Sequence, residues 1–438
     1  MIRSRFRLLC SLAAAAILAA TSLVISQEPR GSARSATLRV LVPETAQLQI
    51  DGIATRQTGA DRSFISPPLQ PGRSYRYMLK ALWGGQTHES EVIVKAGIES
   101  TLDLRGAFAS AAAAPAEHAV AQEASGSLAA LKALYRRPAS IPYPKDNTHT
   151  PAREALGRML FFDPRLSGSN WISCATCHNP ALSWGDGLPR AIGHGMQVLG
   201  RRTPTTLNLA WAEALFWDGR AGTLEEQALG PVEAPGEMNF PLEKMEAKLQ
   251  SIAGYKPLFE QAYPGEGVTR RVVAKALATY ERTMVSEAAP FDHWVAGDER
   301  AISDSARRGF ELFNGKANCA KCHSGWRFTD DSFHDIGLPG TDRGRGVHLP
   351  DIAVSQFAFK TPTLRNADQR APFMHDGCLA TLEEVVDFYD RGGAVKRASL
   401  SHEVKPLQMT AQEKSDLIAF LRTLTSSDKP ALVPALPR

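Results

Sequence analysis

The sequence predicts a mainly α-helical protein with two similar domains, preceded by a small all-β domain and an Ala-rich linker. Three observations support this fold class. A helical pattern followed by Cys-x-x-Cys-His occurs twice, and short alternating segments separated by turn residues fill positions 37–105. The length of 438 residues, with 43% hydrophobic and 22% charged residues, is typical of a globular chain of two or three domains.

The chain opens with a basic and then apolar segment. Arginines cluster before the uncharged run 8–25, and Ser26 places a small residue before a cleavage point at Gln27. Residues 1–26 are therefore predicted to be a signal peptide, with an uncleaved anchor as the alternative because the run is close to the shortest membrane span. We expect a periplasmic or otherwise extracytoplasmic protein.

Residues 37–105 are expected to form a small antiparallel sheet or sandwich, with strands at 37–42, 46–50, 75–82 and 91–94 and a turn at Asp51-Gly52. The stretch resembles a small extracytoplasmic β-module of planctomycete proteins, through Val42-Pro43, Asp51-Gly52, Thr58-Gly59, Arg62-Ser63-Phe64, Ser66-Pro67-Pro68-Leu69 and Pro71-Gly72. The resemblance carries no known chemistry, so a spacer or adhesion role is expected. Residues 106–136 read as a linker that is helical near 128–135.

Charge and cysteine content exclude two classes of function. The net charge is +4, and the arginines Arg3, Arg5 and Arg7 of the predicted signal peptide supply three of these charges. The mature chain then has no basic footprint for nucleic acid. Six cysteines are too few for a disulfide scaffold of this length.

Two domains are expected after the linker, at 137–297 and 298–428. In the first, a helix at 153–162 precedes Asp163-Pro164, and in the second a helix at 305–313 precedes Asn314-Gly315. A closing helix begins at Thr410, where Glu413 completes a capping box. The repeated order of helix, turn and motif indicates an internal duplication.

Each domain carries the attachment signature of c-type haem. The motifs are Cys174, Cys177 and His178, and Cys319, Cys322 and His323. The spacing suits this chemistry because two thiols add to the two vinyl groups on one porphyrin edge, and the following histidine reaches the iron. A four-cysteine zinc site needs its pairs much closer together, and a thioredoxin-like pair needs a βαβ context that neither copy has. Two covalent haems are therefore predicted.

Further motifs between residues 161 and 377 resemble those of bacterial di-haem cytochrome c peroxidases and their relative MauG, which oxidises tryptophans of a protein substrate. The resemblance covers about residues 139–427. It rests on Phe161–Ser167, Gly193–Gly195, Arg202–Pro204, Phe216–Arg220, Leu224–Gln227, Glu237-Met238, Phe359–Asn366 and Pro372–Gly377. It implies two cytochrome c-like domains with electron relay between them.

The resemblance assigns roles around the first haem, which it makes the peroxide-reactive one. It implies that His194 is a removable distal ligand, with Met196 a weaker candidate for the same place. Glu237 and Gln227 are expected over the open face of the haem, where Glu237 assists cleavage of the peroxide O–O bond. Trp217 is expected to relay electrons between the haems. Pro231 matches a further position of this pocket and is given a shaping role.

The second haem is expected to transfer electrons, and Tyr389 is the candidate for its sixth ligand. Thr381 and Glu384 predict a helix whose buried face includes Tyr389. In the resemblance, peroxidases place methionine here and MauG-type enzymes place tyrosine, which stabilises oxidised iron. Met374 and Met409 stay open as competing ligands.

The family holds calcium between its haems through an asparagine side chain and backbone carbonyls. Arg202 and Arg370 occupy two of these positions, which disfavours a divalent cation, although ligation by carbonyl oxygens alone stays open. Cys378 is expected to be a buried small residue, with an intermolecular disulfide as the alternative. Three further histidines are treated as structural: His293, His334 and His348.

The resulting functional hypothesis is a di-haem peroxidase that reduces hydrogen peroxide to water with electrons from a small cytochrome c or cupredoxin. One alternative is MauG-like oxidation of side chains in a partner protein. A second alternative is a non-catalytic di-haem electron-transfer protein.

Overall fold

The computed structural model describes residues 36–50, 53–55, 57–66, 74–84, 86–95, 98–107, 128–429 and 431–438. Two compact units divide the chain, residues 1–117 and residues 118–438, and both haem motifs belong to the second unit. The predicted signal peptide, the turn at Asp51-Gly52 and the Ala-rich part of the linker lie outside the described residues.

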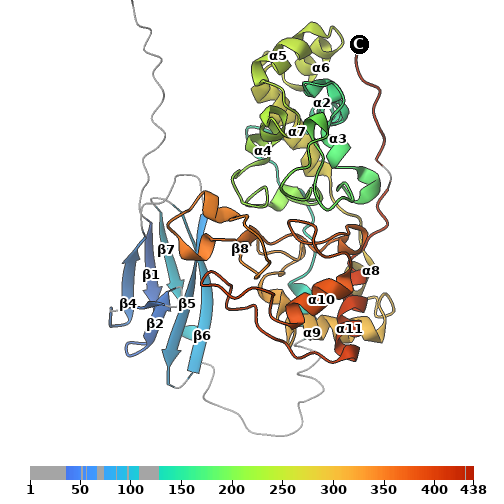
Figure 1. Cartoon of the computed structure of the whole chain (residues 1–438). Coiled ribbons are helices and arrows are strands. Elements are labelled where there is room, and N and C mark those ends of the chain that lie inside the picture. The colour runs from blue at the N-terminus through green and yellow to red at the C-terminus, as the bar shows by residue number, and fades with distance from the viewer. Residues whose placement is uncertain are drawn as a thin grey trace, which may run out of the picture. The chain divides into compact units, whose positions relative to one another are not determined.

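The first unit is built from two small sheets around one core (Figure 1). One sheet has the order β4-β1-β7 and the other β3-β2-β5-β6. The core contains alternating residues such as Leu38, Val40 and Leu48. The strands are β1 (Thr37–Leu41), β2 (Gln47–Ile50), β3 (Ile53–Ala54), β4 (Asp61–Ile65), β5 (Ser74–Trp83), β6 (Gln86–Lys95) and β7 (Glu99–Asp103).

The strands that the sequence analysis missed are β3, β4 and β7. The alternation of β4 is hidden because its inward residue is a buried arginine, Arg62, whose guanidinium donates to the carbonyls of Ala46 at 2.6 Å and Gly59 at 2.9 Å. An antiparallel unit was expected, but strand β7 pairs with β1 in parallel, so the strand pairing is mixed.

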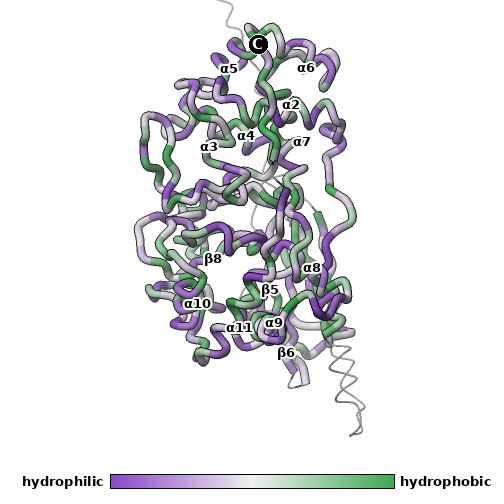
Figure 2. Tube along the Cα trace, turned by 90° about the vertical axis from the view of Figure 1, so that its right-hand side faces the viewer, coloured by the Kyte–Doolittle hydropathy of each residue, from purple (hydrophilic) through white to green (hydrophobic). Residues whose placement is uncertain are grey.

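The second unit is mainly helical, as predicted. In Figures 1 and 2 helices α2 to α7 gather in one half and α8 to α11 in the other. The helices are α2 (Pro151–Phe162), α3 (Cys174–Cys177), α4 (Leu224–Glu233), α5 (Leu242–Ser251), α6 (Tyr255–Ala262), α7 (Arg270–Thr283), α8 (Pro290–Val295), α9 (Asp304–Asn314), α10 (Leu382–Asp390) and α11 (Ala411–Arg422). A short pair of strands, β8 (Phe333–His334) and β9 (Phe359–Lys360), completes it.

Local signals define the helix ends. Thr150 caps α2 by accepting from the Arg153 N–H, and the helix ends at Asp163 as predicted. The buried Asp163 carboxylate then accepts from the Arg165 N–H at 2.9 Å and from the Tyr255 hydroxyl at 2.6 Å. This carboxylate therefore joins the end of α2 to the start of α6.

Each half of the second unit has its own hydrophobic core. The first is formed mainly by α2, α4, α5, α6 and α7, and the second by α8, α9, α10 and α11. The second core also includes Tyr135, at the end of the predicted linker, whose ring packs edge-on against Phe291 at 5.8 Å. Residues 128–133 form a helix next to it. The packing thus assigns segment 128–135 and helix α8 to the second core.

The internal duplication extends beyond the haem motifs. Asn208 and Asn366 both adopt the left-handed conformation, with φ of 62° and 56°. Each side-chain carbonyl accepts from the backbone N–H of a serine, Ser286 at 3.1 Å and Ser426 at 3.0 Å. The two halves therefore close their cores with the same buried contact.

The register of the duplication pairs residues with different chemistry. One bridge closes a turn before α4 and another before α10, and a threonine caps each of these helices. When residues are numbered from the bridge and the threonine cap of each half, Trp217 occupies the position that corresponds to His375. In the same way Pro231 occupies the position that corresponds to Tyr389. The same backbone thus carries different side chains at matching places in the two halves.

Hydrophobic and hydrophilic residues are interleaved along the helices of the second unit (Figure 2). Among the residues that the structure describes, no helix has the length and apolar character needed to span a bilayer.

Candidate functional site

The first haem motif is presented by the short helix α3. Ser173 and Thr176 form a capping box at its start, and the His178 N–H donates to the Cys174 carbonyl at 2.9 Å. The imidazole Nδ1 of His178 donates to the Trp184 carbonyl at 3.2 Å. This contact fixes the tautomer, so the Nε2 lone pair is available to a metal. Burial lowers the pKa of His178, which favours the neutral ligand form.

The second motif repeats the arrangement. The His323 N–H donates to the Cys319 carbonyl at 2.9 Å, and its Nδ1 donates to the Phe328 carbonyl at 2.9 Å. Phe328 and Trp184 both have positive φ, 55° and 62°, which turns each carbonyl toward its histidine. Two unusual backbone conformations thus serve the same purpose.

These donor sets fit covalent c-type haem. In each motif two free thiols and an imidazole with a free Nε2 project from one turn of chain. Burial raises the pKa of Cys177 to about 11 and of Cys319 to about 12, so both are neutral thiols rather than thiolates that would bind a metal ion. Neither pair has the four ligands of a structural zinc site.

A cavity of about 610 Å³ adjoins the first motif and lies between the two halves of the unit. This volume is within the range of cofactor sites. Residues of the first half that line it include Cys174, Cys177, His178, Trp217, Gln227, Pro231 and Glu237, and residues of the second half include Thr363, Arg370, Phe373 and Met374. The structure therefore brings most of the predicted peroxide site into one space.

Glu237 and Gln227 both reach this cavity from α4 and the loop that follows it. Burial raises the pKa of Glu237, against a weaker opposite effect of the Arg220 charge. A carboxyl group shifted in this direction can hold a proton and release it closer to neutral pH. Pro231 lies within the same helix and lines the same wall.

His194 sits on a tight loop against Glu237. Its backbone N–H donates to the carbonyls of Gly236 at 3.1 Å and Glu237 at 2.8 Å. A Cβ on Gly193 would lie 2.0 Å from the Gly236 oxygen, so this approach requires glycine. The His194 Nδ1 is buried without a partner, and Gly193 rather than His194 is among the cavity-lining residues. Ligation of the iron by His194 stays a prediction. Met196, the weaker candidate for the same place, is 78% exposed.

Trp217 is held firmly at the junction of the halves. Its indole N–H donates to the Arg202 carbonyl at 2.8 Å, and its own carbonyl accepts from the Lys360 N–H at 2.8 Å. Its ring packs edge-on against His375 at 6.3 Å, and His375 stacks on Phe359 at 3.6 Å. The contacts give an oxidisable side chain a single position between the two halves.

Tyr389 lies on α10 beside the second motif. The helix is capped by Thr381 as predicted, but Glu384 accepts from the Ala380 N–H at 2.5 Å instead of completing a box with Thr381. Burial and the neighbouring Cys322 and Cys319 thiols raise the pKa of the Tyr389 hydroxyl. Tyr389 was expected on the buried face of this helix but is only part-buried. In the described part of the chain nothing hydrogen-bonds its hydroxyl, which leaves it free to bind a metal.

The two methionines considered as competing ligands lie elsewhere. Met374 lines the cavity of the first motif. Met409 is 8% exposed within the second core, and its N–H donates to Asp390 at 2.9 Å. Cys378 was expected to be buried and is exposed instead, because it follows a surface turn at Asp376.

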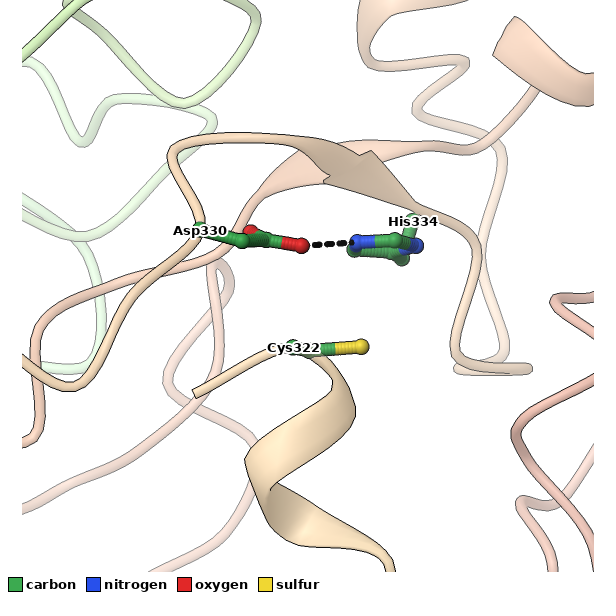
Figure 3. Close-up of side chains that lie close together, drawn as sticks. All are labelled: Cys322, Asp330 and His334. Carbon is green, nitrogen blue, oxygen red and sulfur yellow. Dashed lines mark hydrogen bonds and ion pairs between the residues drawn. The ribbon is translucent and has the colours of Figure 1, made fainter. Parts of the chain in front are cut away.

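His334 has a partner that the sequence analysis did not name. Its Nε2 lies 2.8 Å from a carboxylate oxygen of Asp330, and Cys322 lies beside the pair (Figure 3). Burial lowers the pKa of His334, but Asp330 and Cys322 outweigh this effect and raise it to about 10. Haem attachment converts the Cys322 thiol to a thioether, so these three groups are not a separate metal site.

Other contributors carried no sequence signal. The carbonyls of Trp184 and Phe328 act through the backbone, which a motif search does not show. Glu281 lines the cavity with one carboxylate oxygen buried and unpartnered, and burial raises its pKa to about 8. Its place within the helical run 270–283 gave no indication that it faces a cavity.

Comparison with known proteins agrees with this geometry. The family described as di-haem cytochrome c peroxidase matches residues 151–300, and the cytochrome c family matches residues 306–425. The methylamine utilization protein MauG of Methylorubrum extorquens is 53% identical over 76% of this chain and 95% of its own. The cytochrome c551 peroxidase of Nitrosomonas europaea is 36% identical over 64% of this chain and 82% of its own.

A solved structure described as a MauG-like protein associated with microbial copper homeostasis has a TM-score of 0.62 and 31% identity, covering 66% of this chain and 95% of its own. The di-haem peroxidase BthA of Burkholderia thailandensis has a TM-score of 0.58 and 26% identity, covering 64% and 87%. The cytochrome c domains imply covalent c-type haems at Cys174 and Cys177 and at Cys319 and Cys322. The chain belongs to the di-haem cytochrome c peroxidase and MauG family of oxidoreductases.

Proposed function

We propose that the protein uses hydrogen peroxide to oxidise side chains of a partner protein, in the manner of MauG. The observation that carries this proposal is the part-buried Tyr389 beside the second motif, whose hydroxyl no described residue hydrogen-bonds. A phenolate ligand stabilises oxidised iron, whereas a methionine favours ordinary electron transfer. The 53% identity to a MauG protein supports the same choice.

The bound haem supplies an iron that can bind peroxide and exchange single electrons. Glu237 holds a proton in the cavity and transfers it between the two peroxide oxygens. Gln227 offers an amide that orients the peroxide in the same space. Trp217 is fixed at the junction by its indole hydrogen bond and passes electrons between the halves.

The second candidate is reduction of peroxide to water with electrons from a small cytochrome c or cupredoxin. The observation that favours it is the His194 loop, which is anchored on the carbonyl of Glu237. A histidine that blocks the iron until the other haem is reduced belongs to this activity. The third candidate, electron transfer without catalysis, requires two irons that both keep six ligands.

An anaerobic peroxide titration of the fully ferric protein separates the three candidates. The proposal expects a direct reaction, seen as a long-lived optical change without added reductant. A reaction that needs one reducing equivalent first would favour the second candidate, and no reaction in either state would favour the third.

Variants of Tyr389 test the observation that carries the proposal. Tyr389→Met is expected to abolish the long-lived change while peroxide consumption with an electron donor persists. Tyr135→Phe is the matched control, because Tyr135 is buried in the same half but its hydroxyl donates to Asn314 at 2.6 Å. An unchanged reaction in Tyr389→Met would overturn the role given to this tyrosine.

We also propose that the protein is exported and works outside the cytoplasm. The support is the basic and apolar segment before Gln27 together with two covalent haem motifs. Mass spectrometry of the protein from its native membrane and soluble fractions tests this. A mature chain that begins at Gln27 is expected, and a cytoplasmic chain with Met1 retained would contradict it.

A further inference from the structure

Two buried arginines at the junction of the halves have no acidic partner. Arg202 from the first half and Arg370 from the second are each 7% exposed, and both line the cavity of the first motif. Their neighbour Arg201 pairs with Asp218 and Asp342, both at 2.7 Å. Among the described residues no carboxylate forms such a pair with Arg202 or Arg370.

Backbone oxygens satisfy these side chains only in part. The Arg370 guanidinium donates to the carbonyls of Arg365 at 2.7 Å, Thr363 at 2.8 Å and Asn366 at 3.3 Å, and no contact engages its remaining terminal nitrogen among the described residues. The Arg202 guanidinium donates to the Arg370 carbonyl, and its Nε–H is buried without any partner. Donors and positive charge are therefore left over at the cavity wall.

Both groups carry charge at neutral pH. Burial and the Arg202 charge lower the pKa of Arg370 to about 9, which still leaves it protonated. The acid whose charge acts on Arg202 is Asp186, but it forms no ion pair with Arg202 among the described residues, and its carboxylate accepts from the Thr203 hydroxyl at 2.6 Å. Buried charges without a counter-ion are strongly unfavourable, so the arrangement calls for an anion in the cavity.

We propose that Arg202 and Arg370 form a carboxylate-binding site, and that its ligand is a propionate group of the haem held by Cys174, Cys177 and His178. The pair then supplies the positive charge between the haem domains that a divalent cation would otherwise supply. The Arg202 guanidinium already occupies the Arg370 carbonyl that such a cation would need. This inference goes beyond the proposed function and holds for whichever substrate is oxidised.

The chemistry of the pair suits this ligand. A guanidinium presents parallel N–H donors that match a carboxylate, and two of them can share one anionic group. The arginines and the attachment residues line the same cavity, and a haem bound there brings two carboxylates into it. A free anion such as phosphate is also negatively charged but is not held in place by a covalent bond.

The site also joins the relay residue to the second half. The Arg202 N–H donates to the His375 carbonyl at 2.7 Å, and the Arg202 carbonyl accepts from the Trp217 indole at 2.8 Å. These are backbone contacts, so a change of the Arg202 side chain leaves them available. Side-chain variants therefore test the anion site without removing the support of Trp217.

The test compares Arg202→Gln, Arg370→Gln and Arg202→Lys in the full-length, haem-loaded protein. The readouts are the midpoint potential of the first haem as a function of pH and the propionate bands in its vibrational spectrum. Loss of a guanidinium is expected to lower the potential, because the unpaired propionate stabilises ferric iron. It is also expected to introduce a pH dependence as that propionate titrates.

The comparison variants make the result specific. Arg202→Lys keeps the charge and is expected to restore most of the potential. Arg201→Gln is the matched control, since Arg201 lines the same cavity but has its own carboxylates. If Arg370→Gln does not fold, the Arg202→Gln and Arg202→Lys variants are sufficient to test the proposal. The Arg202 side chain makes a single hydrogen bond, so its replacement is expected to leave the fold intact.

Three outcomes would overturn the proposal. The first is a potential and propionate spectrum unchanged in Arg202→Gln. The second is a shift of the parent protein on addition of inorganic phosphate, which would indicate a free anion as the ligand. The third is one tightly bound calcium per chain, found by elemental analysis, whose removal by a chelator reproduces the changes.

Discussion

At the scale of single residues, the first cavity contains two carboxyl groups with different surroundings. Glu237 shares the space with Gln227 near the His194 loop, whereas Glu281 lies on α7 with one oxygen that has no partner. Burial raises the pKa of both. Glu237 lies in the loop that follows α4, against the His194 loop, whereas Glu281 lies within a helix. We therefore expect only Glu237 to transfer protons to and from peroxide.

Glu237→Gln keeps the shape of this side chain but cannot transfer a proton. Peroxide consumption is expected to fall by about 10²–10⁴-fold, the usual contribution of a positioned acid or base. Steady-state peroxide assays measure the rate, and intact mass checks that both haems are attached. Glu233→Gln on the exposed face of α4 is the control, and equal rates in the two variants would exclude a proton-transfer role.

Glu281 makes stability depend on pH. Its pKa is about 8 in the native state against 4.5 for an ordinary glutamate. Between these values the native state binds more protons than the unfolded state, so the free energy of unfolding falls as pH rises. Glu281→Gln removes this slope and is expected to be the more stable form above pH 8, by at most about 5 kcal/mol.

Denaturant unfolding of both proteins at several pH values measures this difference. The two curves are expected to converge below pH 4.5, where the carboxyl is protonated in both states. A constant difference across the whole range would show that the substitution acts through packing and not through ionisation.

At the scale of elements, each core depends on one close helix crossing. A Cβ on Gly157 of α2 would lie 2.0 Å from the Ala276 carbonyl oxygen of α7. A Cβ on Gly309 of α9 would lie 2.0 Å from the Asp416 carbonyl oxygen of α11. The duplicated helix pairs therefore approach through glycine in the same way.

Alanine at either glycine must push its helix pair apart. Gly157→Ala and Gly309→Ala are each expected to cost about 1–3 kcal/mol or more, as overpacked cores do. Because the cores are separate, their costs should add in the double variant. Calorimetry measures this, and a double variant no less stable than either single one would show that the two costs are not independent.

The sequence was most informative where an element begins or ends with a side-chain signal. The threonine caps located α10 and α11, and Asp163-Pro164 located the end of α2. Strands β3 and β7 escaped because they are short or carry no clear alternation. Helix α8 was expected in the first haem domain but packs against the second core. This packing depends on contacts with residues distant in sequence, which a local pattern does not show.

At the scale of the whole molecule, the chain after α11 returns to the first half. The Pro437 carbonyl accepts from the Arg165 guanidinium at 2.9 Å, and the Arg438 carbonyl accepts from the Gly254 N–H at 2.7 Å. Ala431 packs against the first core. Segment 431–438 therefore links the two halves outside the cavity.

Removal of residues 431–438 is expected to destabilise the first half by about 1–3 kcal/mol, because two hydrogen-bonded groups lose their partners. Thermal unfolding followed at the first haem measures the effect, and the spectrum of the second haem should not change. Leu432→Ala is the control, since this side chain is 75% exposed. A truncated protein as stable as the parent would show that the segment contributes no stability.

The candidate site shows the same division between local and distant information. The haem motifs are contiguous, so their residues could be read directly from the sequence. The pairing of Arg202 with the Arg370 carbonyl joins the two halves, and the sequence showed only that two cations replaced neutral groups there. Such contacts depend on how the halves pack, which no local pattern encodes.

The equivalence of Pro231 and Tyr389 has an evolutionary consequence. After a gene duplication, the two copies of one position can diverge. One copy can keep a side chain that binds metal, as Tyr389 could, while the other acquires a residue whose side chain has no donor atom. Proline is such a residue, and it also removes a backbone N–H from its helix. Position 231 is therefore where a protein engineer would try to turn one ancestral half into a copy of the other.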